Sequence, residues 1–170
     1  MEKKNNHATL YFDAKSVNES FARMAVMAFM TDMNPTIEQM EDVKTAVSEA
    51  VTNAIIHGYQ ENGKRGETQE ERRQKAKEEE QETEQKEQQV EMILDRDGSK
   101  LVVQIIDKGV GIDNIEEALQ PFFTTKPELE RSGMGFAFMD AFMDGLSVDS
   151  TPGKGTRVVM TKYIERTNEQ

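Results

Sequence analysis

The sequence predicts a single domain of the α+β class, because helical and strand patterns both recur along its 170 residues. Apolar residues repeat at spacings of three and four between residues 37 and 54, which is the period of a helix with one buried face. An Asp-Gly pair at residues 97–98 separates two apolar runs, as in a β-hairpin. Two further apolar runs flank a Pro-Gly-Lys-Gly turn near the C-terminus, which predicts two closing strands.

Two helices are expected in the N-terminal third of the chain. Ser16 followed by Glu19 is a capping-box pattern, so a helix should begin at the next residue after the serine. Thr36 followed by Gln39 repeats the pattern, and the helix that it starts should run to Gly58, a natural C-terminal cap. The apolar stripe of this second helix consists of Ile37, Met40, Val43, Val47, Val51 and Ala54.

The other elements follow from shorter patterns. Strands are predicted at residues 9–12, 90–94, 101–106, 146–149 and 156–163. Short helices are expected at residues 115–119 and 135–143, with a long loop over 121–132 between them.

Residues 61–88 interrupt this organisation. Between Tyr59 and Val90 the only apolar side chain is Ala76, and the segment Glu61–Glu87 holds ten acidic and seven basic residues. Such a segment cannot bury enough apolar surface to offset the entropy lost on ordering. We therefore expect one domain over residues 1–170 with a charged, mobile insertion, and a solvated helix held by charge pairs is the alternative.

Composition excludes several classes of function. The chain has no cysteine, which excludes disulfides, thiolate zinc sites and a cysteine nucleophile. A net charge of -11 disfavours direct binding of nucleic acid. The polar N-terminus lacks the apolar core of a signal peptide, and no apolar run approaches the roughly 20 residues that span a bilayer. We expect a cytoplasmic protein without a membrane segment.

Glu49 and Asn53 are the first candidate functional residues. They lie four residues apart on the second helix, so both project from one face, roughly opposite the stripe that contains Val47 and Val51. The amide oxygen of an asparagine suits Mg²⁺, and a carboxylate one turn away could take a proton from a hydroxyl nucleophile or order a water. An ordinary polar helix face has the same spacing, and on spacing alone it is the simpler interpretation.

Asp107 ends an apolar strand, and glycines follow it at positions 109 and 111. A carboxylate in this place could accept a hydrogen bond from an exocyclic amine such as that of adenine. Gly109 and Gly111 would let the backbone approach a flat ring closely. A plain turn after a strand is the alternative.

A glycine-rich segment leads into the helix predicted at residue 135. Ser132, Gly133 and Gly135 leave free N–H groups at the helix start, which attract anions. Donors suited to phosphate precede them at Thr124, Thr125, Lys126 and Arg131. Arg131 is equally compatible with a surface charge, and Thr156 with a simple hairpin.

The order of these motifs resembles the GHKL ATPase superfamily, which includes gyrase, MutL and histidine kinases. The matching motifs are Glu49-x-x-x-Asn53, Asp107-x-Gly109-x-Gly111, Gly133-x-Gly135 and Gly155-Thr156. Three stretches are similar to one branch of it, the bacterial sporulation anti-sigma factors: Asn18–Arg23, Ser48–Tyr59 and Phe123–Phe136. The resemblance covers nearly the whole chain, and the charged insertion is its departure from the family.

The resemblance implies a two-layer α/β sandwich of the GHKL (Bergerat) type, with helices on one face of a mixed sheet. It implies ATP and Mg²⁺ as cofactors, with Glu49 as general base, Asn53 as magnesium ligand, Asp107 as adenine reader and Arg131 as γ-phosphate sensor. The other nucleotide contacts would come from Gly109, Gly111, Thr124, Thr125, Lys126, Ser132, Gly133, Gly135 and Thr156. It further implies a homodimer that inhibits a sporulation sigma factor, contacted by Arg23, and phosphorylates a serine of an anti-anti-sigma protein.

Two other functions remain open. A binding module could hold ATP and a partner without phosphotransfer, but the presence of Glu49 favours a kinase. A detached histidine-kinase catalytic domain would need a phosphoacceptor helix, and His7, in a polar tail before the first strand, does not supply one.

Overall fold

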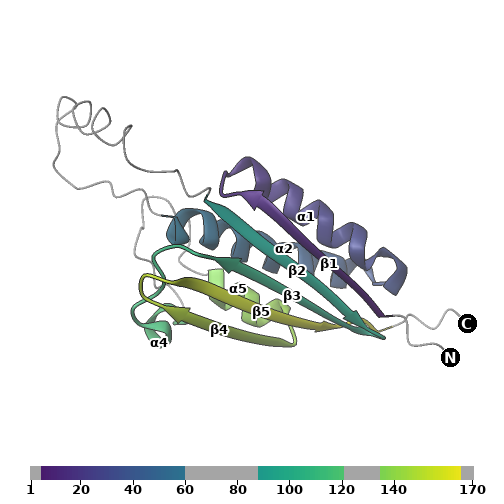
Figure 1. Ribbon diagram of the computed structural model, residues 1–170. Helices are drawn as coiled ribbons and strands as arrows, with labels where there is room; N and C mark the ends of the chain where they lie inside the picture. The colour runs from purple at the N-terminus through teal and green to yellow at the C-terminus, as the bar shows by residue number, and fades with distance from the viewer. Residues whose placement is uncertain (1–4, 60–87, 121–134, 166–170) are drawn as a thin grey trace, which may run out of the picture.

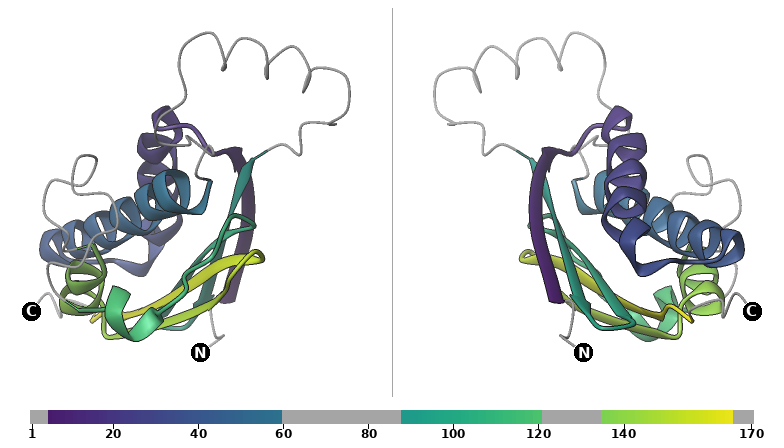
Figure 2. Two further views of the ribbon diagram at one scale, coloured as in Figure 1. Left: turned by 90° about the vertical axis from the view of Figure 1, so that its left-hand side faces the viewer. Right: turned by 90° about the vertical axis from the view of Figure 1, so that its right-hand side faces the viewer.

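The computed structural model describes residues 5–59, 88–120 and 135–165, which form two layers (Figures 1 and 2). Helices α1 (Val17–Met30), α2 (Ile37–Asn53) and α5 (Gly135–Phe142) cover one face of a five-stranded sheet. The opposite face of the sheet carries no helix within the described ranges. A short helix, α4 (Ile115–Ala118), lies in the connection between β3 and α5. The predicted α+β class and the two-layer arrangement are confirmed.

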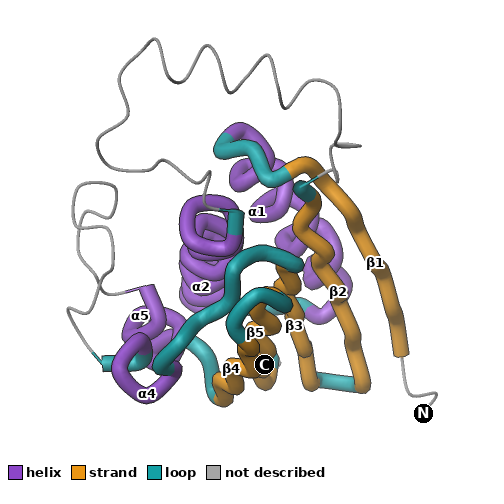
Figure 3. Tube along the Cα trace, turned by 60° about the vertical axis from the view of Figure 1, so that its left-hand side comes forward, coloured by secondary structure: helices purple, strands orange, loops and turns teal. Residues whose placement is uncertain are grey.

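The sheet has the strand order β1-β2-β3-β5-β4, with β1 at one edge (Figure 3). Its strands are β1 (Asn5–Asp13), β2 (Gln89–Asp97), β3 (Lys100–Asp107), β4 (Gly145–Thr151) and β5 (Gly155–Tyr163). All four neighbouring pairs are antiparallel, so the expectation of a mixed sheet is wrong. The physical reason is the β4–β5 hairpin: β4 runs in the same direction as β3, but the hairpin places β5 between them.

The two predicted capping boxes have different outcomes. At the start of α2, the Thr36 hydroxyl accepts the Gln39 N–H at 3.1 Å, and the Gln39 side chain accepts the Thr36 N–H at 3.0 Å. The helix α1 begins after Ser16 as predicted, but Ser16 has helical dihedrals and makes no capping hydrogen bond. The Glu19 carboxylate instead accepts a hydrogen bond from Ser48 of α2. A tertiary contact between helices has replaced the local cap.

The second helix changes its winding before it ends. The α-helix α2 stops at Asn53, and a π-helical turn, η2 (Ala54–Gly58), continues it. The helical segment ends at Gly58 as predicted, but Gly58 lacks the positive φ of a left-handed cap, so its predicted role as a C-terminal cap is wrong. A short 3₁₀ turn, η1 (Thr31–Met33), joins α1 to α2 through Asn34, which does have a left-handed backbone.

The core lies between the helices and one face of the sheet. Alternate strand residues point toward the helices, as the period of two requires. Those of the central strands are Val90, Met92 and Leu94 of β2, Leu101, Val103 and Ile105 of β3, and Val158 and Met160 of β5. The predicted stripe of α2 is buried against them from Val43 to Ala54, whereas Ile37, the first residue of the helix, is 81% exposed.

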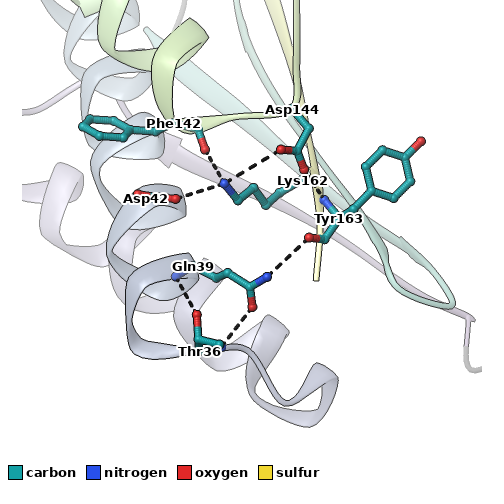
Figure 4. Close-up of polar contacts among 7 residues, drawn as sticks. All are labelled: Thr36, Gln39, Asp42, Phe142, Asp144, Lys162 and Tyr163. Carbon is teal, nitrogen blue, oxygen red and sulfur yellow. Dashed lines mark hydrogen bonds and ion pairs between the residues drawn. The ribbon is translucent and has the colours of Figure 1, made fainter. Parts of the chain in front are cut away.

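Lys162 connects the C-terminal end of α5 to α2 and β5 (Figure 4). Its Nζ donates to the Phe142 carbonyl oxygen at 2.6 Å and to Asp42 Oδ2 at 2.9 Å. Phe142 ends α5, so its carbonyl oxygen accepts no hydrogen bond from within the helix. The Lys162 side chain is only 12% exposed, and Asp144 beside it accepts the Tyr163 N–H at 2.6 Å. This cluster fixes the position of α5 relative to α2.

We predict that Lys162→Met lowers the free energy of unfolding by about 1–3 kcal/mol, because it leaves a part-buried carboxylate and a helix-end carbonyl without their donor. Urea unfolding measures the change. The matched control is Lys44→Met, whose partner Glu41 is 57% exposed, and we expect it to cost less than about 0.5 kcal/mol. Equal losses in the two variants would contradict the role given to the Lys162 cluster.

Candidate functional site

A pocket of about 500 Å³ lies between the end of α2, the end of β3 and the start of α5. Its volume falls within the roughly 300–1,000 Å³ of small-molecule sites. Figure 3 shows α2, α4 and α5 grouped around the loop that follows β3. Predicted site residues that line the pocket are Asn53, Asp107, Gly111, Gly135 and Thr156. The fold thus gathers residues that are more than 100 positions apart in the sequence.

Much of the pocket wall is apolar. The apolar side chains that line it are Ala50, Ala54, Ile105, Val110, Ile112, Ala118, Phe136 and Val158. Asp107 supplies a buried carboxylate at the end of β3, and Asn53 supplies an amide from α2. Apolar walls with a few fixed polar groups are typical of sites that bind small molecules.

Asp107 is 5% exposed, which is unusual for a carboxylate. Its Oδ1 accepts the Gly109 N–H at 2.9 Å. Burial raises the pKa of Asp107 above its usual value, and hydrogen bonds from the Gly109 and Thr156 backbone oppose this shift. A carboxylate has about four acceptor positions, so Asp107 keeps capacity for a donor from a ligand.

Two glycines let the end of η2 touch the turn after β3. A Cβ at Gly58 would lie 2.7 Å from the Asp107 carboxyl carbon, and one at Gly109 would lie 1.7 Å from the Gly58 carbonyl oxygen. That oxygen accepts the Val110 N–H at 2.8 Å. Gly109 therefore packs on Gly58 and does not line the pocket. Its contact with a ligand stays a prediction.

Gly111 has a different environment. Its φ of +74° is left-handed, and a Cβ there would lie 2.3 Å from the Thr151 carbonyl oxygen. It lines the pocket, and the approach of its backbone to a ligand stays a prediction.

Ser150, which the sequence analysis missed, does not line the pocket but contacts Ile112 and Thr156, which do. Its Oγ accepts the Ile112 N–H at 2.8 Å and lies 2.9 Å from Thr156 Oγ1, and it donates to the Gly155 carbonyl at 3.0 Å. It thereby joins the loop after β3 to the β4–β5 hairpin. The predicted strand at 146–149 stopped one residue short of Ser150, which pairs with Thr156 across the two strands.

Glu49 and Asn53 meet at the first residue of α5. A Cβ on Gly135 would lie 3.2 Å from Glu49 Oε2 and 3.2 Å from Asn53 Nδ2. The predicted shared face of α2 is therefore next to the pocket, with Asn53 in its wall and Glu49 at its margin. Because Gly135 has no side chain, the start of α5 can lie this close to Glu49 and Asn53.

The donor set at this face fits Mg²⁺. Asn53 and Glu49 offer oxygen ligands, which this ion prefers. The described residues contain no cluster of three or more His, Cys, Asp or Glu that could enclose a metal. Magnesium keeps several waters and takes few protein ligands, so a partial set of this kind suits it when a substrate supplies further oxygens.

Other predicted residues are not brought to the pocket or cannot be placed. Arg23 lies on α1, where its Nε is 2.9 Å from Glu19 Oε1 and its guanidinium donates to Ser20 at 3.1 Å. It does not line the pocket, and its role in partner binding stays a prediction. The charged insertion at 61–88, apart from its last residue, lies outside the described residues. So do six predicted phosphate contacts: Thr124, Thr125, Lys126, Arg131, Ser132 and Gly133.

Comparisons with known proteins agree on one family. The sequence model for the histidine kinase-like ATPase domain matches residues 12–162. The anti-sigma F factor of Clostridium beijerinckii is 49% identical over 157 residues, which cover 92% of this chain and 94% of the relative. That of Caldanaerobacter subterraneus subsp. tengcongensis is 49% identical over 162 residues, or 95% and 96% of the two chains. That of Bacillus licheniformis is 44% identical over 161 residues, or 95% and 94%.

A solved structure supports the fold. The crystal structure of the RsbU and RsbW domains of a Mycobacterium tuberculosis protein matches with a TM-score of 0.58 and 15% sequence identity. The match covers 95% of this chain and 32% of that chain. Among the residues that the structure describes, no helix combines the length and apolar character needed to cross a membrane.

We predict that Asp107→Asn stabilises the ligand-free protein at neutral pH. Because burial raises the folded-state pKa of Asp107 above 3.8, the folded protein binds this proton more tightly than the unfolded chain, and stability falls as pH rises through that window. Asparagine keeps an acceptor for the Gly109 N–H and removes the buried charge. Urea unfolding at about pH 5 and about pH 8 measures the effect.

The stabilisation should be greater at the higher pH. Asp13→Asn, an exposed carboxylate at the end of β1, is the control. A variant less stable than the wild type at both pH values would contradict this account of Asp107.

Proposed function

The chain belongs to the histidine kinase-like ATPase family and, within it, to the anti-sigma F factors, and from this premise we propose its activity. It binds ATP with Mg²⁺, holds a sporulation sigma factor inactive and phosphorylates a serine of an anti-anti-sigma protein, acting as a homodimer. The observation that carries the enzymatic part is one pocket with Asp107 in its wall and the Glu49–Asn53 face next to it.

Adenine fits the end of the pocket at Asp107. A carboxylate can accept a hydrogen bond from the exocyclic amine of adenine, but it repels the carbonyl oxygen that a 6-oxopurine carries at the same position. Ile105 and Val158 provide apolar contacts for the ring, and Gly111 lets the backbone approach it.

The phosphates would extend toward Asn53 and Gly135. The start of α5 offers backbone N–H groups and the positive end of the helix dipole. Asn53 would hold magnesium together with phosphate oxygens and water. When bound, magnesium would neutralise part of the charge on the transferred phosphoryl group. Arg131 would add a positive charge on the γ-phosphate.

Transfer to serine requires a proton acceptor, and we assign that role to Glu49, whose carboxylate lies next to Gly135. The serine oxygen forms a bond to the γ-phosphorus, and the bond from this phosphorus to the bridging oxygen breaks, with the electron pair leaving on ADP. The hydroxyl proton passes to the Glu49 carboxylate. Glu49 lies one helical turn from Asn53, so the acceptor and the metal ligand address the same phosphoryl group.

We predict that Glu49→Ala lowers the rate of serine phosphorylation by roughly 10²–10⁴-fold, because a general base is lost. Labelled ATP and purified anti-anti-sigma protein, followed by phosphoamino acid analysis, measure the rate and identify the acceptor. ATP affinity should stay close to that of the wild type, since Asp107 and Asn53 are intact.

The control is Glu41→Gln, two turns earlier on α2, where the carboxylate pairs with Lys44 at the surface. Undiminished transfer by Glu49→Ala would remove Glu49 from the mechanism. A wild-type protein that binds ATP and the sigma factor but transfers no phosphate would favour the binding-module alternative.

A further inference from the structure

Tyr59 follows η2 directly, and its hydroxyl connects the ends of two strands. It donates to the Gln89 carbonyl oxygen at 2.5 Å and accepts the Lys108 N–H at 3.0 Å. Gln89 begins β2, and Lys108 is the residue after Asp107. The ring packs against the core, so the hydroxyl is held at a defined position. Tyr59 itself does not line the pocket.

The turn after β3 is held at three consecutive amide groups. The Lys108 N–H donates to the Tyr59 hydroxyl, the Gly109 N–H to Asp107 Oδ1, and the Val110 N–H to the Gly58 carbonyl. The first and third acceptors belong to adjacent residues at the end of η2. The middle acceptor is the carboxylate assigned to adenine. Any rotation of this turn therefore moves the Gly109 N–H and the Asp107 carboxylate with it.

The protonation of Tyr59 supports this arrangement. Burial raises the pKa of the Tyr59 hydroxyl, and the nearby Asp107 charge raises it further, against hydrogen bonds to Lys108 and Gln89 that lower it. The hydroxyl therefore stays protonated at neutral pH and can donate to Gln89 while it accepts from Lys108.

We propose that Tyr59 is a positioning residue for adenine recognition: its hydroxyl sets the orientation of the turn at 107–111 and, through it, of the Asp107 carboxylate. The inference rests on the proposed ATP-binding function and adds to it a residue outside the pocket. It also assigns a structural role to the π-helix η2, which brings both Gly58 and Tyr59 to the loop at 107–111. Turns of this kind are rare and are often found at functional sites.

Tyr59→Phe isolates the hydroxyl, because phenylalanine keeps the ring packing and the Gly58 contacts. Loss of one positioning hydrogen bond should weaken ATP binding about threefold to tenfold. Inosine triphosphate differs from ATP at the group that Asp107 would recognise, so its weaker binding should hardly change. The preference of the variant for ATP over inosine triphosphate should therefore be smaller than that of the wild type. A general loss of protein stability would weaken the binding of both nucleotides alike.

Calorimetric titration of the full chain with ATP–Mg²⁺ and with inosine triphosphate–Mg²⁺ measures both affinities. The matched control is Tyr11→Phe, which removes the same atom from a residue that is 62% exposed and donates to Glu91 at 2.7 Å. Thermal unfolding without nucleotide checks that both variants fold. We expect Tyr11→Phe to bind both ligands as the wild type does.

An unchanged ATP affinity in Tyr59→Phe, or an equal loss for both nucleotides, would overturn the role of Tyr59 while wild-type ATP binding stands. A wild type that does not bind ATP would overturn the proposed function and this inference with it. The two failures are distinguished by the wild-type titration alone.

Discussion

The contact between Gly58 and the turn after β3 is the constraint on which the site depends. At this point the helix layer and the sheet layer meet backbone to backbone, and a Cβ on either Gly58 or Gly109 would lie within 2.7 Å of an atom of the other segment. This close approach buries Asp107 while leaving it in the wall of the pocket. Burial raises the pKa of the Asp107 carboxylate and so lowers stability at neutral pH. The same burial gives the pocket a fixed group suited to the proposed recognition of a base.

One helix connects the two ends of the site. The buried stripe of α2 holds it on the sheet, and its other face places Glu49 and Asn53 next to Gly135. Its continuation, η2, carries Gly58 to Asp107. The spacing between the proposed base-binding and phosphate-binding ends is therefore set within a single helical segment. Lys162 binds the last carbonyl of α5, at the opposite end of this helix from Gly135.

Local patterns predicted the elements well, and long-range contacts account for the errors. The Thr36 cap, the apolar period of α2 and the Asp-Gly hairpin are local signals, and the structure confirms them. Ser16 shows the opposite case, because the glutamate that should complete its cap bonds to another helix. The contact of Tyr59 with Lys108 spans 49 positions, so no local pattern could reveal it. The strand order likewise depends on long-range pairing, because β5 of the β4–β5 hairpin lies between β3 and β4.

The central claim is that Asp107 reads adenine, and the most direct test is the ATP affinity of Asp107→Ala measured by calorimetry. Loss of a charge-assisted hydrogen bond should weaken binding by roughly 1.5–3 kcal/mol, which corresponds to about a tenfold to 150-fold rise in Kd. Asp13→Ala, which removes an exposed carboxylate far from the pocket, should leave the affinity unchanged. Wild-type affinity in Asp107→Ala would contradict the claim.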